Sequence, residues 1–388
     1  MSFSFRLAAL LLLCLSPCLT RAKDIPLLVR PDVESGLYQP GQTVTWSITV
    51  PEDVTEVEGL PDQLNYELKT NGQDTYEKKS LDFSSRAATV SATLDKPGSV
   101  LLVLRGKGIK KSFGGATFGF KQIKPSLEKP ADFDQFWDQK RQLADTINLD
   151  PQLQSTESPN DAVEMWEVSL ANINGTRARG QLAIRKGGEK QPAVLVLQWA
   201  GVYPLGKYWT AKSAEGGFIT LNMLAHDLPI YEDKAFYDAR KKGELANYYC
   251  LGNDDREQSY FLRMYLGCYQ ALRYLKTRPE WDGKTLLVTG NSQGGMQSLV
   301  TAALADGITA VMVNKPAGCD LNGPVAGRAP GWPKWYHNVK DKDEAKVREA
   351  ARYFDVVNFA DRIQCPVLVG VALADTTCPP SGVFAAIN

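Results

Sequence analysis

The chain has 388 residues, enough for two domains with cores of ordinary size, and 44% of its residues are hydrophobic. Lysine and arginine together number 44, as do aspartate and glutamate, so the net charge is +0 at pH 7. Such a chain has no broad positive field of the kind that attracts nucleic acid or an anionic membrane surface, so we expect neither as a partner. A neutral or weakly charged substrate fits this composition better.

The first residues are typical of a secretory signal peptide. Arg6 precedes an apolar stretch that reaches about Leu19, and the small residue Ala22 follows. This pattern predicts a signal peptide over residues 1–22 and a secreted or periplasmic protein. The apolar stretch is too short for a membrane span. A lipid anchor at Cys18 is a minor alternative, because the proline before it is a poor residue at a cleavage site.

Residues 23–123 favour short strands in which apolar and polar side chains alternate, separated by turn pairs such as Pro-Gly and Asn-Gly. This pattern predicts a small antiparallel β-sandwich, and we find no chemical constellation in it. Trp46 lies inside one of these strands, so we expect it in the core rather than on a sugar. The strands are predicted over residues 43–50, 65–69, 87–94 and 100–105.

A linker is expected at residues 124–130, where two prolines and charged residues disfavour regular structure. Residues 131–388 then open with an amphipathic helix for which Asp132 is the expected cap. Beyond it, nearly continuous apolar runs alternate with helical segments, which predicts a parallel sheet covered on both faces and so an α/β fold. The strands are expected over residues 193–198, 218–223, 285–289, 310–313 and 366–371.

Cysteine and histidine are scarce and scattered. Of seven cysteines, two lie within the predicted signal peptide, and the others are too far apart for a disulfide framework, although one bridge could form in an oxidising compartment. Whether Cys250 pairs with Cys268 stays open. The chain has only two histidines and no C-x-x-C spacing, so we expect neither a metal site nor a cofactor.

Residues 290–294 read Gly-Asn-Ser-Gln-Gly, which has the form G-x-S-x-G. They follow the apolar run 285–289 and precede residues 296–305, which are rich in helix formers. Strand, turn and helix in this order are typical of the nucleophile elbow of α/β-hydrolases, where glycines let the backbone turn sharply. We therefore predict an α/β-hydrolase fold after the sandwich, with Ser292 as the nucleophile.

The chain order of that fold also suggests the partners of the serine. The triad acid follows a later strand, and Asp375 comes shortly after the strand expected at 366–371. One oxyanion donor should be the backbone N–H of Gln293, and the other should come from the loop after residues 193–198, where we choose Val202. Aromatic side chains in and after this loop could form a substrate pocket: Trp199, Tyr203, Tyr208 and Trp209.

Neither histidine of this sequence has the place in chain order that is expected of the general base. Both histidines, His226 and His337, precede Asp375, whereas the hydrolase order places the catalytic histidine after the acid. We expect His226, beside Asp227, to make a loop contact near the site. We expect His337 on the surface or in a contact between subunits.

Residues 132–388 resemble the acetyl xylan esterase and cephalosporin C deacetylase family, carbohydrate esterase family seven. The resemblance implies a secreted serine esterase that removes acetyl groups from O-acetylated sugars or polysaccharides, with Ser292 and Asp375 in the triad and Gln293 and Val202 as oxyanion donors. It implies no cofactor, and members are often homo-oligomers. It rests on several separated pieces: DFDQFW at 132–137, GNSQGG at 290–295, ADRI at 360–363, CP at 365–366 and DTTCPPS at 375–381.

The chain departs from the family pattern in three places. Residues 200–202 read Ala-Gly-Val where the family usually has His-Gly-Tyr, and residues 225–227 read Ala-His-Asp where it has Arg-Gly-Gln. The Gly-His-Glu segment that carries the catalytic histidine would lie beyond Asn388. We therefore expect the chain to be a piece of a longer esterase, because a serine without a base loses most of its reactivity.

Two other functions stay open at this point. A catalytically inactive glycan-binding homologue is supported only by the missing histidine, and the complete gene sequence would decide it. A serine peptidase of the prolyl oligopeptidase type also joins β structure to this fold. Its elbow normally has an aromatic residue where this chain has Gln293, and the residues before Pro130 are too few for its propeller.

Overall fold

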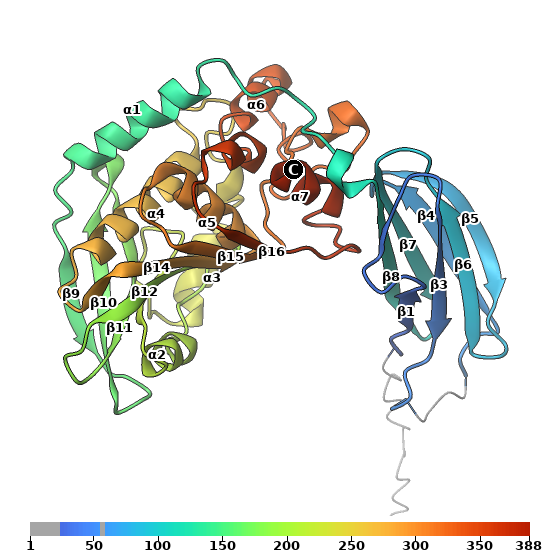
Figure 1. The fold of residues 1–388 in the computed structure, drawn as a ribbon, viewed down its shortest axis with the longest axis horizontal. Coiled ribbons are helices and arrows are strands. Elements are labelled where there is room, and N and C mark those ends of the chain that lie inside the picture. Colours follow the sequence, from blue (N-terminus) through green and yellow to red (C-terminus); the bar gives the residue numbers. More distant parts are fainter. Residues whose placement is uncertain (1–23, 55–58) are drawn as a thin grey trace, which may run out of the picture.

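The computed structural model describes residues 24–54 and 59–388, so the signal peptide predicted over residues 1–22 lies outside the described residues. Two β regions stand side by side, joined by a short segment that leads into a long helix (Figure 1). No helix in the described ranges is long and apolar enough to cross a membrane.

The N-terminal region is a sandwich of two sheets with one apolar core between them. Trp46 lies in that core with no exposed surface, as its alternating strand predicted. Four strands were not predicted from the sequence: two of them are short, one is largely charged and one contains two glycines. One sheet contains β1 (Leu28–Pro31), β3 (Thr43–Thr49) and β6 (Ala87–Thr93); the other contains β2 (Leu37–Tyr38), β8 (Ile109–Phe118), β7 (Gly98–Gly106), β4 (Gln63–Thr70) and β5 (Asp74–Asp82).

A short 3₁₀ turn, η1 (Phe120–Gln122), leads toward helix α1 (Phe133–Thr146). The apolar face of α1 is buried, as its spacing predicted, and Asp132 stands at the expected N-cap position, but its side chain does not cap the helix. Asp132 makes no side-chain hydrogen bond to the helix and instead accepts one from Arg256 Nη1 at 2.7 Å and another from the Tyr353 hydroxyl. The carboxylate is drawn away because a hydrogen bond from a guanidinium is stronger than one from a backbone amide.

The second region is built on an eight-stranded mixed sheet in the order β16-β15-β14-β12-β13-β11-β10-β9. The predicted parallel strands are all present and pair in parallel. An antiparallel flank of three strands was not predicted, because polar residues interrupt its apolar pattern. The parallel strands are β12 (Gln191–Leu197), β13 (Ile219–Met223), β14 (Trp281–Asn291), β15 (Ala310–Asn314) and β16 (Val367–Gly370); the flank contains β9 (Gln152–Thr156), β10 (Val163–Ala171) and β11 (Arg177–Arg185).

Helices α1, α4 (Tyr260–Lys276) and α5 (Gln293–Leu304) pack together on one face of this sheet, and α2 (Lys207–Glu215) packs on β10, β11 and β13. Over β15 and β16 the face away from α5 is open, where Met312 is 50% and Leu368 is 68% exposed. The expectation that both faces are covered is therefore wrong at this edge of the described chain. The remaining helical segments are η2 (Ile173–Gly175), α3 (Lys234–Lys242), η3 (Tyr248–Cys250), η4 (Gly323–Ala326), α6 (Glu344–Ala351), η5 (Val356–Asn358), η6 (Ala360–Arg362) and α7 (Pro380–Ile387).

Candidate active site

Ser292 occupies the turn between β14 and α5 with φ 55° and ψ −119°, a conformation that non-glycine residues rarely adopt. Backbone hydrogen bonds hold it there. Its N–H donates to Asn314 O at 3.0 Å, and its carbonyl accepts from the N–H groups of Met296 and Ala317 at 3.1 and 3.0 Å. The turn at the end of a central parallel strand therefore has the backbone strain expected of a nucleophile elbow.

The two glycines of the motif are required by close contacts at this turn. A Cβ on Gly290 would lie 2.3 Å from the backbone of Gly294, and a Cβ on Gly294 would lie 2.0 Å from the carbonyl oxygen of Leu197. Neither contact can be relieved by a side-chain rotation, because the obstructing atoms belong to the backbone. The spacing G-x-S-x-G is thus a steric requirement of the elbow in this structure.

Asp375 lies on the loop between β16 and α7. Its Oδ1 accepts hydrogen bonds from the backbone N–H groups of Thr377 at 2.7 Å and Cys378 at 2.8 Å. The sulfur of Cys378 lies 3.9 Å from Ser292 Oγ. Ser292 and Asp375 therefore both contact one residue, Cys378. Burial and the nearby Asp375 carboxylate raise the pKa of the Cys378 thiol to about 11, so this residue carries no charge at neutral pH.

The two expected oxyanion donors are the N–H groups of Gln293 and Val202, and we call the segments that carry them the oxyanion flank of Ser292. Gln293 begins α5, where backbone N–H groups have no helical acceptor, and Val202 lies in the loop after β12. Among the described residues, neither of these two N–H groups donates a hydrogen bond. Tyr248 links the two segments: its hydroxyl accepts from Gly201 N at 3.3 Å and donates to Gln293 Oε1.

His226 is buried against the same loop, with only 2% of its surface exposed. Its Nε2 lies 2.9 Å from Gly201 O and its Nδ1 lies 2.6 Å from the Tyr260 hydroxyl, so both ring nitrogens have partners. Burial and, to a smaller extent, the charge of Arg263 together lower the pKa of His226 to about 4, although the hydrogen bond to Gly201 O opposes this shift, so the ring is neutral at neutral pH. The expected loop contact of His226 is confirmed, and it is to the loop that carries Val202.

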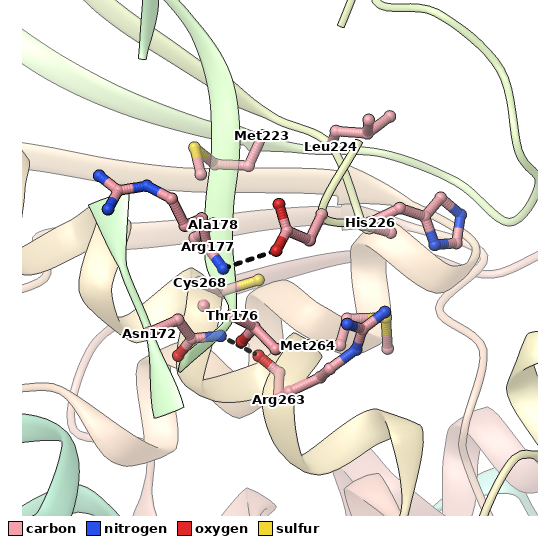
Figure 2. A pocket seen from close by; sticks show the side chains of 13 residues that line it. Asn172, Thr176, Arg177, Ala178, Met223, Leu224, His226, Arg263, Met264 and Cys268 are labelled. Carbon is pink, nitrogen blue, oxygen red and sulfur yellow. Dashed lines mark hydrogen bonds between the residues drawn. The ribbon is translucent and has the colours of Figure 1, made fainter. Parts of the chain in front are cut away.

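Asp227 makes a separate contact and does not pair with the histidine. Its carboxylate accepts from Arg179 Nε at 2.7 Å and from Arg177 N at 2.9 Å. Asp227 and His226 border a small cavity that Asn172 and Arg263 also line (Figure 2). The other histidine, His337, is exposed, as one of its two interpretations predicted.

The aromatic residues expected in a substrate pocket separate into two groups. Trp199 is 54% exposed and lines an open cavity of about 560 Å³ together with Gly290, Met312 and Leu368. Tyr203 does not line this cavity but stacks on Trp199, with ring centroids 5.7 Å apart, and donates to its carbonyl at 2.7 Å. Tyr208 and Trp209 lie apart from this cavity on α2, 58% and 73% exposed.

The described residues, 24–54 and 59–388, contain five cysteines. Cys250 and Cys268 are free thiols, as are Cys319, Cys365 and Cys378. These described ranges contain no group of three or more side chains suited to hold a metal ion.

A strained serine between a central parallel strand and a helix, with a carboxylate on the loop after a later parallel strand, defines an α/β-hydrolase. The family model for acetyl xylan esterase (AXE1) matches residues 119–388. The acetyl esterase Axe7A of Xylanibacter ruminicola is 32% identical over 305 residues, which cover 77% of this chain and 69% of that protein. The chain belongs to the acetyl xylan esterase family, and the resemblance drawn from its sequence is confirmed.

Two solved structures agree with this assignment. The acetyl xylan esterase from Paenibacillus sp. R4 is 27% identical with a TM-score of 0.60, and the match covers 69% of this chain and 87% of that one. Acetyl xylan esterase 1 from Thermoanaerobacterium sp. JW/SL YS485 is 24% identical with a TM-score of 0.60, over 69% of this chain and 86% of that one. The second likeness supports the fold alone.

Proposed function

We propose that this protein is a secreted serine esterase that removes acetyl groups from O-acetylated carbohydrates through an acyl-enzyme. The observation that carries the proposal is the strained turn at Ser292, with a free N–H on Gln293 immediately after it and the Asp375 loop next to it. Membership of a family of acetyl esterases gives the acyl group. Export rests on the pattern of residues 1–22.

In the proposed reaction, Ser292 Oγ attacks the acetyl carbonyl carbon while its proton passes to a base. The carbonyl oxygen becomes an oxyanion, which accepts hydrogen bonds from the N–H groups of Gln293 and Val202. The C–O bond to the sugar then breaks, and the sugar oxygen takes the proton from the base. Water attacks the acetyl-serine by the same steps in reverse roles and releases acetate.

We propose a histidine as the base, because the aspartate of a catalytic triad acts on an imidazole. His226 is excluded because both of its ring nitrogens are engaged and burial keeps its pKa near 4, whereas a general base needs a pKa near the working pH. His337 is exposed, and no described contact connects it to Ser292. Asp375 would orient and stabilise the histidine once it carries the proton.

The aromatic residues give a proposal for the sugar. Trp199 is the exposed aromatic residue of the cavity next to Gly290, so we propose that one face of its ring packs against the carbohydrate. Tyr203, which stacks on Trp199 and donates to its carbonyl, would keep the Trp199 ring in place. Tyr208 and Trp209 on α2 could contact a longer chain of sugars, since both are largely exposed.

The test is release of acetate from 4-nitrophenyl acetate and from acetylated xylan. It compares the 388-residue chain with the product of the complete gene, each with and without Ser292→Ala. We expect activity in the complete protein only, abolished by the substitution. No activity in any form would overturn the esterase proposal and favour an inactive glycan-binding homologue, for which binding of acetylated xylan without turnover would be the evidence.

A further inference from the structure

The loop that carries Asp375 lies directly on the N-terminal sandwich. A Cβ added to Gly115 of β8 would lie 2.2 Å from the carbonyl oxygen of Leu373 and 2.6 Å from the backbone nitrogen of Ala374. Only a glycine allows two backbones to approach this closely. This contact is with the residues immediately before Asp375. The backbone N–H of Asp375 itself donates to Ala372 O at 3.1 Å, which forms a turn.

Apolar side chains extend this contact on both sides. Leu373 reaches Gly36, where an added Cβ would lie 2.5 Å from its Cδ1. Phe120, just after β8, lies against Phe384 of α7 with ring centroids 5.2 Å apart. Asn388 Nδ2 donates to Phe120 O at 2.6 Å and to Ile123 O at 3.0 Å. The loop and the helix that follows it therefore rest on the sandwich and on the segment after it (Figure 1).

We propose that the sandwich is a positioning element for catalysis: its β8 strand fixes the loop that carries Asp375 at the distance the triad needs. This inference rests on the proposed function, since it takes Asp375 as the triad acid. The sandwich contributes no reacting group itself. It would act by reducing the freedom of this loop, which also contacts the hydrolase region through the hydrogen bond from Trp332 N to Thr377 O at 2.8 Å.

The experiment uses the complete protein and two neighbouring glycines of one strand. Gly115→Ala pushes the Leu373 carbonyl away by about 1 Å, because a carbon and an oxygen repel well before 2.2 Å. Gly114→Ala is the matched control, since its Cβ would meet Trp46 at 2.9 Å inside the sandwich core and not the loop. We expect Gly115→Ala to lower kcat by about 10²-fold, as a displacement of this size can do, and Gly114→Ala to leave kcat unchanged even if it lowers Tm.

A double-mutant cycle tests whether Gly115→Ala lowers kcat by displacing Asp375. If it does, Gly115→Ala costs nothing further in an Asp375→Asn background. Two results would overturn the inference without contradicting the proposed esterase function. One is a loss of kcat in the double variant equal to the product of the losses in the two single variants; the other is a folded Gly115→Ala protein with normal kcat. Should that variant not fold, Leu373→Ala takes its place, with a smaller loss of about threefold to tenfold and the same lack of additivity. Full activity of Asp375→Asn would instead remove the triad assignment and this inference with it.

The contacts of the loop that carries Val202 support a second, independent inference. A trans peptide is planar, with its C=O and its N–H directed to opposite sides. Tyr260 donates its hydroxyl proton to His226 Nδ1, which leaves the proton of the neutral ring on Nε2, and Nε2 donates to Gly201 O. The N–H of the same peptide, that of Val202, must then face away from His226.

The geometry points to His226 as a positioning residue that orients the Gly201–Val202 peptide so that the Val202 N–H meets the oxyanion. Tyr248 completes the arrangement, because its hydroxyl holds Gly201 N on one side and the Gln293 side chain on the other. This inference also rests on the proposed function, since it takes Val202 as an oxyanion donor.

The test compares His226→Leu, which removes the donor, with His226→Gln, whose amide N–H can replace it. We expect His226→Leu in the complete protein to lower kcat by about 10-fold to 10²-fold, with little change in KM. The affinity of methylboronic acid, which forms a tetrahedral adduct with an active serine, should fall by the same factor. His226→Gln should recover most of both losses.

A folded His226→Leu protein with normal kcat, or with reduced kcat and normal boronate affinity, would overturn this second inference. If His226→Leu does not fold, Tyr260→Phe supplies the measurement, since it frees Nδ1 and lets the ring change its tautomer; the expected loss in boronate affinity is about threefold to tenfold. A wild-type protein that neither cleaves acetyl esters nor binds the boronate would remove the proposed function, which is a different result.

Discussion

The two flanks of Ser292 are held by different kinds of contact. On the oxyanion flank, buried polar side chains within the hydrolase region connect Gly201 to Gln293 and to His226. On the acid flank, the Asp375 loop rests by backbone and apolar contact on a separate β region. Hydrogen bonds fix direction, which an oxyanion donor needs, whereas close packing fixes position, which a charged partner needs.

The largest expected effect breaks the acid flank. Asp375→Asn should lower kcat by about 10⁴-fold, because an amide cannot stabilise a protonated histidine or hold it in the right tautomer. Steady-state kinetics with 4-nitrophenyl acetate measure this. Asp361→Asn, a surface carboxylate 3.0 Å from Lys129, is the control and should change kcat little. A similar loss in both variants would contradict a specific role for Asp375.

The next effect concerns the neutral histidine of the oxyanion flank. Its pKa is about 4 in the folded protein and near 6.5 when unfolded, so the unfolded state binds more protons between these values. Stability from His226 is therefore complete above pH 6.5 and is lost as the pH falls toward 4. The difference in unfolding free energy between wild type and His226→Gln should shift by on the order of 3 kcal/mol across this window.

Chemical unfolding of both proteins at several pH values measures this difference and cancels groups common to both. The charged group facing the ring is Arg263, which adds to the effect, and Tyr248 and Tyr260 stay neutral throughout this range. A difference that does not vary between pH 7 and 4 would mean that His226 is not buried as a neutral ring.

A smaller effect should follow from moving the oxyanion loop itself. Gly201 has φ 135°, and a Cβ there would lie 2.8 Å from the ring of Tyr203. Gly201→Ala should therefore lower kcat by about 10-fold to 10²-fold through a misplaced Val202 N–H, with a matching loss of boronate affinity. Gly206→Ala, in the same connection with nothing within 4 Å, is the control and should be neutral. Equal losses in the two variants would contradict the steric argument.

The smallest effect on kcat is expected from substitution of Cys378, which contacts both Ser292 and Asp375. Cys378 is close to Ser292, but with a pKa of about 11 its thiol is neither a nucleophile nor a base at neutral pH. Cys378→Ala should therefore change kcat by less than about threefold and lower stability by about 1 kcal/mol through the lost volume. Kinetics and thermal unfolding check both values. A loss of activity above tenfold would assign the thiol a part in the reaction.

Much of the site could be anticipated because its pieces are local. The elbow is a strand, a turn and a helix within one short stretch, and both glycines are explained by contacts over a few residues or with the neighbouring strand. Polar side chains with distant partners could not be anticipated. The hydroxyl of Tyr260 in α4 binds His226; a buried tyrosine hydroxyl needs a partner, and that need was the available signal.

The sequence by itself determined the parallel strands, the sandwich, the elbow at Ser292 and the family, because each depends on periodicity or on residues close together in the chain. The tertiary structure alone decided what holds the site in place. Gly115 meets Leu373 and His226 meets Gly201 across long separations in the chain, and contacts of that kind follow from how sheets and loops pack in space. Their residue types alone, a glycine in a strand and a histidine in a loop, are compatible with many other partners.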